Sequence, residues 1–223
     1  MTIRWPIGVL PPQNVAFDIA SRSLSGPPAV SGAVQVVSSD AGIWKATFGG
    51  VLVRSRNAVL AFRGIANLLE GRLGSILVPL CRGYQPVDPA HRTLYDGVPH
   101  GDGASFGDGS LYVGQVIDAT LASSVAVRAV SASINIRHAA PLEPGQHFSI
   151  AERLYRLRTV QYASDTTAAI TFRPPLREAA SAGTRLEFDD PVCRMRLASD
   201  SEMDLELALR RFAQPTVNFV EDL

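Results

Sequence analysis

The sequence predicts a mainly β fold with one helix, whose short strands form a small barrel or sandwich. Three observations predict it. Apolar and non-apolar side chains alternate with a period of two along several segments, which is the pattern of a strand with one buried face. Turn-forming residues separate these segments at short intervals, without intervening helices. Clear helical periodicity occurs only at about residues 56–70.

The N-terminal thirty residues contain five prolines and one strand-like stretch, at Val15–Ile19. Proline fixes φ and lacks an N–H donor, so we expect an extended arm with edge or turn character. Strands are expected at Val34–Val37 and Ile43–Phe48. The segment Ser39-Asp40-Ala41-Gly42 between them predicts a hairpin loop.

The predicted helix carries an apolar stripe formed by Ala58, Phe62, Ile65 and Leu69 and widened by Ala61 and Leu68. Either Ser55 or Asn57 is expected to cap its start, and Gly71 with Gly74 to end it. Gly64 lies in the middle of the helix, at a cost of about 1 kcal/mol relative to alanine. We interpret Gly64 as a place where a neighbouring element approaches the helix backbone closely.

A buried strand is predicted at Ser75–Leu80, and the composition changes after it. Residues 82–110 are rich in glycine and proline, so no regular element is expected there. A structureless segment of this length inside a compact domain is unusual unless it has a task. It is either a linker between domains or a loop that becomes ordered in an interface.

The second half of the chain predicts a series of short strands separated by turns. They are expected at Leu111–Ala119, Val125–Ile136, His147–Ile150, Leu154–Tyr162, Thr167–Phe172, Arg185–Phe188 and Val192–Leu197. Strands at such spacing are typical of a small barrel or sandwich.

The clearest alternation lies near the C-terminal end, where apolar side chains occupy every second position from Met203 to Leu209, followed by Arg210. These residue types are mostly good helix formers, but a helix would scatter the apolar ones around its axis. A strand places them on one face. The chain turns at Ala213-Gln214-Pro215 and resumes at Val217–Val220. We expect a terminal hairpin that pairs with N-terminal strands, because an unpaired hairpin is only marginally stable.

The composition is that of a soluble globular protein. Its 21 basic residues balance its 21 acidic ones, so no general attraction to nucleic acid or anionic membranes is expected. No apolar run has transmembrane length, and the N-terminus lacks a signal-peptide pattern. Cys81 and Cys193 have no CxxC spacing, and Cys193 alternates with apolar residues, which predicts a buried thiol. We expect folding in a reducing cytoplasm.

The alternating Asp and Gly residues of His100–Gly109 are the first candidates for a metal-binding or catalytic role. This pattern predicts turns, because an EF-hand calcium loop needs more liganding positions and a distal Glu. His91, His100 and Asp102 match no metal-binding spacing, and Ser105 lacks the surroundings of a nucleophile elbow. The sequence therefore identifies no catalytic, metal-binding or cofactor-binding residue.

An arginine-rich stretch with interleaved aromatic residues allows two interpretations. It is either an oligonucleotide-binding barrel face or a subunit interface or solvated face, and the balanced charge favours the second. The stretch comprises Arg153, Arg156, Arg158, Arg173 and Arg177 with Tyr155, Tyr162 and Phe172. Glu143 and Glu152 are interpreted as solvated carboxylates and not as a glycosidase acid pair.

Three groups of segments carry a family resemblance. The first reads FRGIANLLEGRLGSILVP at 62–79, and the second reads VPHGDGASFGDG at 98–109. The third comprises PGQHFSI at 144–150, RLYRL at 153–157, FRPPLR at 172–177 and PVCRMRL at 191–197. Together, from about Phe62 onward, they resemble the distal tail (hub) proteins of long-tailed bacteriophages.

The resemblance implies a β-barrel or split-barrel hub domain with one helix, and a second small β-barrel or sandwich domain. We expect residues 1–95, including helix 56–70, to form the hub domain, completed by the terminal hairpin at 198–223. Residues 96–197 are expected to form the inserted or appended domain. The family carries no active-site residues, so the resemblance implies a structural protein without a cofactor and not an enzyme.

The resemblance also implies a place and partners. We expect a ring of six copies at the tail tip of the virion, assembled in the host cytoplasm. It binds the tail tube protein on one side and hub or receptor-binding tail proteins on the other, with no nucleic-acid specificity and no membrane insertion. Two alternatives are a carbohydrate- or receptor-binding module, in which Trp5, Trp44 and tyrosines stack on sugar, and a cell-wall hydrolase.

Overall fold

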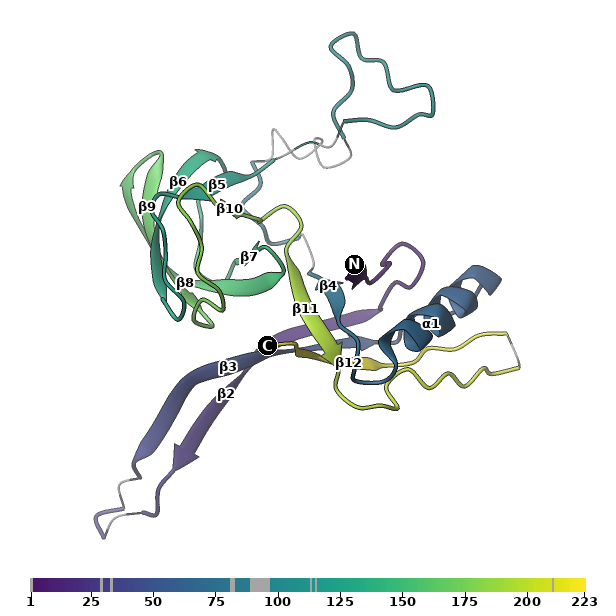
Figure 1. The fold of residues 1–223 in the computed structure, drawn as a ribbon, viewed down its shortest axis with the longest axis horizontal. Coiled ribbons are helices and arrows are strands. Elements are labelled where there is room, and N and C mark those ends of the chain that lie inside the picture. Colours follow the sequence, from purple (N-terminus) through teal and green to yellow (C-terminus); the bar gives the residue numbers. More distant parts are fainter. Residues whose placement is uncertain are drawn as a thin grey trace. The chain divides into compact units, whose positions relative to one another are not determined.

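The structure is a computed structural model that describes residues 2–28, 30–32, 34–80, 83–88, 97–112, 114, 116–209 and 211–223. It is mainly β, as the sequence predicts, with one helix among the described residues. It contains a nearly closed six-stranded, barrel-like sheet and a second six-stranded sheet. The chain forms two compact units: unit 1 comprises Met1–Leu80 and Val192–Leu223, and unit 2 comprises Cys81–Pro191 (Figure 1).

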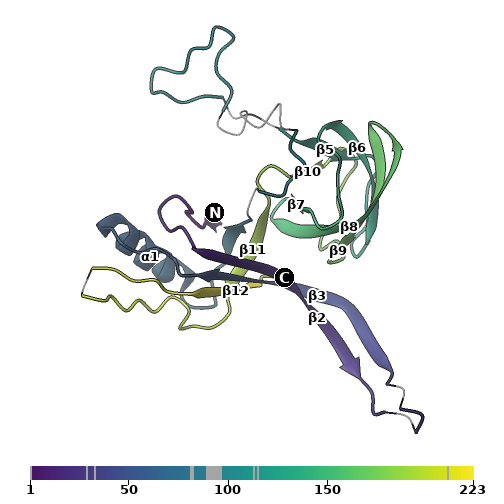
Figure 2. The same ribbon diagram turned by 180° about the vertical axis from the view of Figure 1, so that it is seen from behind.

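The sheet of unit 1 joins N-terminal to C-terminal strands. Its strands are β1 Ile3–Arg4, β2 Asn14–Ser25, β3 Val36–Gly49, β4 Ile76–Pro79, β11 Val192–Leu197 and β12 Val217–Glu221. They follow the order β1-β4-β11-β12-β3-β2, and Figure 2 shows the same sheet from behind. β1 and β4 are parallel, and every other neighbouring pair is antiparallel.

Strand β11 explains why unit 2 ends at Pro191 and not at the expected limit of 197. It pairs with β4 and β12, so it belongs to unit 1, and unit 2 ends at Pro191. The predicted alternation is present: Cys193, Met195 and Leu197 are all buried. Cys193 is therefore the buried thiol that the sequence predicts, whereas Cys81 lies outside the described residues.

Four aromatic rings form the centre of the unit 1 core. Trp5 is edge-on to Phe48 and Phe219, with ring centroids 5.6 Å apart in both cases, and Phe62 lies 6.5 Å from Trp5. The indole N–H of Trp5 donates to the carbonyl oxygen of Leu10 at 3.0 Å, so its polar atom is satisfied inside the core. The N-terminal arm is therefore anchored by its tryptophan.

Helix α1, Arg56–Leu69, confirms the predicted helix and the burial of Ala58, Phe62, Ile65 and Leu69, whereas Leu68, expected to widen the stripe, is 66% exposed. Ser55 is the N-cap, because its side-chain oxygen accepts from the backbone N–H of Ala58 at 3.1 Å. The helix ends at Glu70, which adopts the left-handed conformation with φ 45°. The interpretation of Gly64 is wrong for the described chain, because a Cβ at this position would meet no atom within 4 Å.

The predicted hairpin loop at residues 39–42 is wrong, because β3 runs unbroken through it. β2 and β3 pair from Asn14 opposite Gly49 to Ser25 opposite Val36, so the chain reverses direction beyond Ser25. The register shifts between Ala20 and Arg22. A Cβ on Gly42 would lie 2.6 Å from Ile19, so the glycine that suggested a turn instead permits close approach at this irregularity.

The expected terminal hairpin is half right. β12 pairs with both β11 and β3, but residues 203–209 form no regular strand. Isolated bridges join Ala208 to Phe212 and Val53 to Ala213. Met203 is buried and Leu207 lines a groove beside α1, whereas Leu209 is 83% exposed. The alternation therefore does not correspond to one continuous buried face.

The sheet of unit 2 forms a nearly closed barrel. Its strands are β5 Asp118–Leu121, β6 Ser131–His138, β7 His147–Ile150, β8 Arg153–Ser164, β9 Thr167–Arg173 and β10 Arg185–Leu186. They follow the order β10-β5-β6-β9-β8-β7, all antiparallel. Ser149 and Glu187 exchange backbone hydrogen bonds of 2.9 and 2.8 Å, which bring the two ends of the sheet together.

The barrel interior contains apolar side chains from all six strands. Phe148 contacts the rings of Tyr155, Phe172 and Phe188 at centroid distances of 5.4 to 5.7 Å. The predicted strands at 147–150 and 192–197 have the observed bounds, whereas those expected at 111–119 and 125–136 start too early. Segment 125–130 contributes only an isolated bridge from Val125 to Ala180.

Candidate functional site

The β2–β3 ribbon is the first candidate contact surface. β12 pairs with β3 only from Lys45 to Phe48, and among the described strands the outer part of β3 pairs with β2 alone. Figure 1 shows the two strands running beyond the rest of their sheet. β2 also forms the edge of that sheet. An edge strand of 12 residues offers backbone N–H and C=O groups for pairing with another chain.

Apolar side chains are exposed toward the tip of the ribbon. They are Val30, Val34, Val36 and Val37, each at least half exposed. Exposed apolar residues that cluster on one feature are typical of contact surfaces. A two-stranded ribbon is also only marginally stable in water without further packing. Both properties indicate that the ribbon contacts another molecule.

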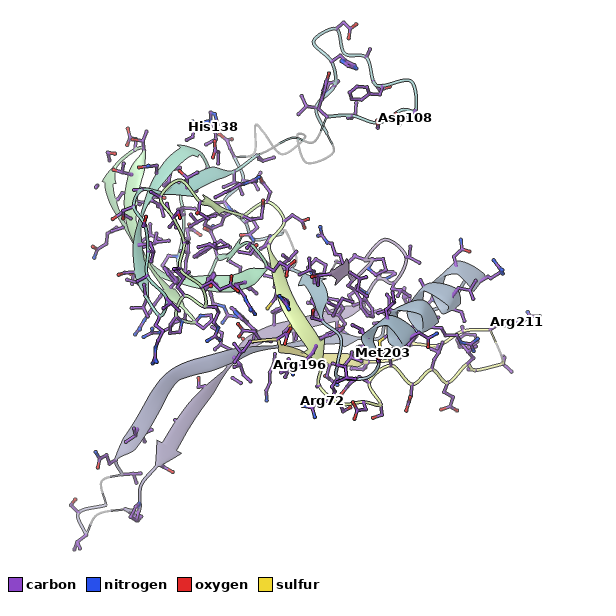
Figure 3. All side chains as sticks on the ribbon, viewed as in Figure 1. Arg72, Asp108, His138, Arg196, Met203 and Arg211 are labelled. Carbon is purple, nitrogen blue, oxygen red and sulfur yellow. The ribbon has the colours of Figure 1, made fainter. Side chains whose placement is uncertain are left out.

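A groove beside α1 is the second candidate surface. It has a volume of about 570 Å³. Its apolar part comes from Val59, Leu60 and Leu207, and its charged rim from Arg54, Arg56, Arg63 and Arg211. Figure 3 shows Arg211 at the far end of the C-terminal loop that follows Met203. Sequence reasoning missed this groove because its two sides lie about 150 positions apart.

The glycine-rich segment folds into two turns of the same design. The N–H of Ala104 donates to Asp102 at 2.9 Å, and the N–H of Ser110 donates to Asp108 at 2.9 Å. The Ser110 hydroxyl and N–H lower the pKa of Asp108 by stabilising its carboxylate. The Asp and Gly residues therefore build turns, as the sequence predicts.

Three rings hold these turns together. His100, Phe106 and Tyr112 contact one another at centroid distances of 4.7, 5.1 and 4.8 Å. They are spaced six residues apart, one at the start of each turn and one after the second. Backbone hydrogen bonds between Val98 and Tyr112 close the segment. His100 and Asp102 thus have local structural contacts, and Ser105 is exposed between the turns.

The other candidates for chemistry do not converge. His91 lies outside the described residues. Glu143 precedes β7 and Glu152 follows it, so a four-residue strand of about 13 Å separates them, more than the spacing of a glycosidase pair. Within the described ranges, no group of three or more His, Cys, Asp or Glu side chains is placed to hold a metal ion.

The less favoured interpretation of the arginine-rich stretch, a face on which bases stack, finds little support. Tyr155 and Phe172 are buried inside the barrel, whereas Tyr162 is 48% exposed. Arg153 pairs with Glu178 at 3.2 Å, and the Nε–H of Arg156 donates to His147 at 2.9 Å. Of the three rings in this stretch, Tyr162 alone is accessible for stacking on a base.

The outer face of the barrel carries a hydroxyl-lined groove of about 420 Å³. Its polar lining includes Ser123, Ser124, Ser131, Ser133, Thr159, Thr171 and Gln161. No aromatic residue is in its lining. Trp5 and Trp44, which the sequence offered for sugar stacking, are 1% and 0% exposed in the unit 1 core, so neither can stack on a ligand.

Asp189 secures one end of the barrel. Its carboxylate accepts from the N–H of Ile117 at 3.0 Å and of Val116 at 3.3 Å, and pairs with Arg185 at 2.9 Å. Burial, and then the Glu187 carboxylate, raise the pKa of Asp189 above its ordinary value, while Arg185 and the two N–H groups oppose this shift. This carboxylate therefore has a structural role, because it holds the backbone of Val116 and Ile117 directly before β5.

Replacing Asp189 by alanine is expected to destabilise the barrel by about 1–3 kcal/mol, because two buried N–H groups lose their acceptor. Because folding raises this pKa, the stability from the carboxyl is fully present in acid and is lost as pH rises through the raised pKa. The difference in the free energy of unfolding between the wild-type protein and Asp189→Ala should therefore narrow as pH rises. Urea unfolding at several pH values measures it. Asp165→Ala, in the exposed β8–β9 turn, is the control and should change stability by less than about 0.5 kcal/mol.

Comparison with known proteins does not assign the chain to a family. No family model matches it, and no curated protein sequence matches it. No helix among the described residues is long and apolar enough to cross a membrane.

Proposed function

We propose that this protein is a structural subunit of a bacteriophage tail tip. In this proposal six copies form a ring that connects the tail tube to hub or receptor-binding components. The β2–β3 ribbon is the observation that carries the proposal. It presents a long edge and exposed valines that a monomer leaves unused, and a neighbouring copy would cover both.

The two-unit arrangement also supports a connecting role. Unit 1 is closed by strands from both ends of the chain, so unit 2 is inserted between two parts of one sheet. An insertion of this kind leaves unit 1 free to repeat the same contact around a ring, while unit 2 meets other tail proteins. The resemblance to distal tail proteins has the same division into a hub domain and an added domain.

Native mass spectrometry and electron microscopy test the proposal. Purified full-length protein is expected to form a closed ring of six, and the ring is expected to bind the tail tube protein end-on. Ring formation and binding to the tube protein are measured separately, with the tube protein alone as the control. A strictly monomeric protein that does not join tails would contradict the proposal.

The second candidate is a carbohydrate- or receptor-binding module, and the hydroxyl-lined groove is the observation that favours it. Its Ser, Thr and Gln side chains provide donors and acceptors of the kind that recognise sugar hydroxyls. Glycan-array binding by the full chain tests this candidate. Binding that is lost in Gln161→Ala and retained in Gln146→Ala, which changes an amide outside the groove, would support it.

A further inference from the structure

The charges at the two ends of α1 are the reverse of what the helix itself favours. A helix dipole stabilises acidic residues near the N-terminus and basic residues near the C-terminus. Arg54 and Arg56 flank the start of α1, no acidic residue occupies its first turn, and Glu70 caps its end. Arrangements that break a local rule in this way are expected where a function requires them. The reversed charges therefore indicate a partner at each end.

The basic end of α1 is a groove with an apolar floor. Arg56, Leu60 and Arg63 follow one another at helical spacing, so they share one face of α1. Arg211 faces them from the C-terminal loop. In the part of the chain that the structure describes, Arg54, Arg56, Arg63 and Arg211 form no ion pair. Such a groove fits an acidic segment with an apolar side chain.

The acidic end of α1 has the complementary character. Glu70 and Asp200 are exposed there beside the exposed Arg72, and Asp204 is exposed four positions after Asp200 in the chain. Asp200 is held against the turn after the helix, because its carboxylate accepts from the N–H of Arg72 at 3.1 Å. Leu73, in the same turn, is 86% exposed. Figure 3 places Arg72 and Arg211 toward opposite ends of α1.

The exposed face of α1 between the two ends is open. Leu60, Gly64 and Leu68 follow one another every four residues, so they form one stripe. Leu60 is 50% exposed and Leu68 is 66% exposed. Gly64 between them leaves space that another element can enter, because a Cβ there meets no atom within 4 Å. The stripe continues the apolar floor of the groove toward the acidic end.

We propose that copies of this chain dock head to tail through α1, the acidic end of one copy entering the arginine groove of the next. This inference rests on the proposed ring and names a second contact between neighbouring copies, in addition to the β2–β3 ribbon. The occupant is a second copy, because the chain carries both complementary patches and has no net charge. A row of copies joined head to tail leaves one patch free at each end of the row. If the rotation from one copy to the next brings these two free patches together, the row closes into a ring.

Charge reversal tests the contact. Arg56→Glu with Arg63→Glu, and separately Glu70→Arg with Asp204→Arg, are each expected to reduce ring assembly at least about tenfold in native mass spectrometry. All four changes in one chain are expected to restore it, as is a mixture of the two double variants. The groove variant should melt at or slightly above the wild-type temperature, because Glu near the helix start suits the dipole. Loss of assembly is then not a loss of folding.

Arg128→Glu with Arg137→Glu is the matched control, because it reverses two exposed arginines on unit 2. It should leave the ring intact. Raising the salt concentration from 0.15 to 1 M should weaken assembly, since the screening length falls from about 8 Å to about 3 Å. Gly64→Trp should block assembly by filling the open stripe while leaving the monomer folded.

The outcomes separate this contact from the ring itself. A wild-type protein that forms no ring overturns the proposed function. A ring that persists in both double variants overturns only the α1 contact. If each double variant fails and their combination does not restore assembly, the groove binds a different acidic partner, and docking of one copy on the next is wrong.

Discussion

Replacing Trp5 by alanine is expected to remove a large part of the stability of unit 1 and to leave the stability of the unit 2 barrel unchanged. The indole contacts Phe48, Phe62 and Phe219 and is 1% exposed. Removing a buried tryptophan costs about 3–5 kcal/mol, because the cavity is not refilled. A domain has only about 5–15 kcal/mol of stability in total. Hydrogen exchange measures the result, with protection expected to fall in β3 and β12 and to persist in β6, β8 and β9.

Leu73→Ala is the control for this experiment, because the side chain is 86% exposed and its loss should change stability by less than about 0.5 kcal/mol. If the barrel loses protection together with unit 1, the two units unfold as one, and their separate description is wrong for stability. If Trp5→Ala leaves unit 1 protected, the aromatic cluster is not the centre of its core. Both results are read from the same exchange data.

Local patterns in the sequence predicted the elements whose burial follows one simple period. The helix was found because Phe62 and Leu69 recur at helical spacing and Ser55 offers a cap. Strand β11 was found because Cys193, Met195 and Leu197 all face the core. In these elements the pattern along the chain and the packing partner agree, so a single sequence is enough.

The sequence misled where a residue type has two structural uses. Gly42 suggested a turn, but in β3 it permits Ile19 to approach the strand. The alternation near Leu207 suggested a strand, but the segment packs beside a helix. Both uses satisfy the same local rule, and only the tertiary partner distinguishes them.

The arginine groove had one readable signal. Arg54 and Arg56 at the start of the predicted helix, and Glu70 at its end, oppose the helix dipole, and this was visible in the sequence. The position of Arg211 was not, since it depends on how the C-terminal loop folds back along α1. The ribbon was also missed, because its length depends on pairing between β2 and β3 and not on either strand alone.

Shortening the β2–β3 ribbon is expected to abolish ring assembly and preserve the fold of unit 1. Ala20 and Ile43 are directly paired, so an Asn-Gly turn in place of residues 21–42 closes a hairpin at this point. The pairing of β3 with β12 over Lys45 to Phe48 is retained. The association constant between neighbouring copies is expected to fall at least about tenfold, which corresponds to a loss of at least about 1.4 kcal/mol of binding free energy. Native mass spectrometry measures assembly, and circular dichroism checks the fold.

A shortened glycine-rich loop is the matched comparison. Val98 and Tyr112 are paired, so an Asn-Gly turn in place of residues 99–111 also closes a hairpin and removes a shorter exposed segment. The assembled ring of copies should survive this change. The loop's aromatic side chains His100, Phe106 and Tyr112 contact one another, so the loop needs no neighbouring copy to cover them. If the loop variant loses the ring and the ribbon variant keeps it, the loop is the element that joins neighbouring copies. The ribbon would then lose its role, since its exposed edge would have no partner in the assembly.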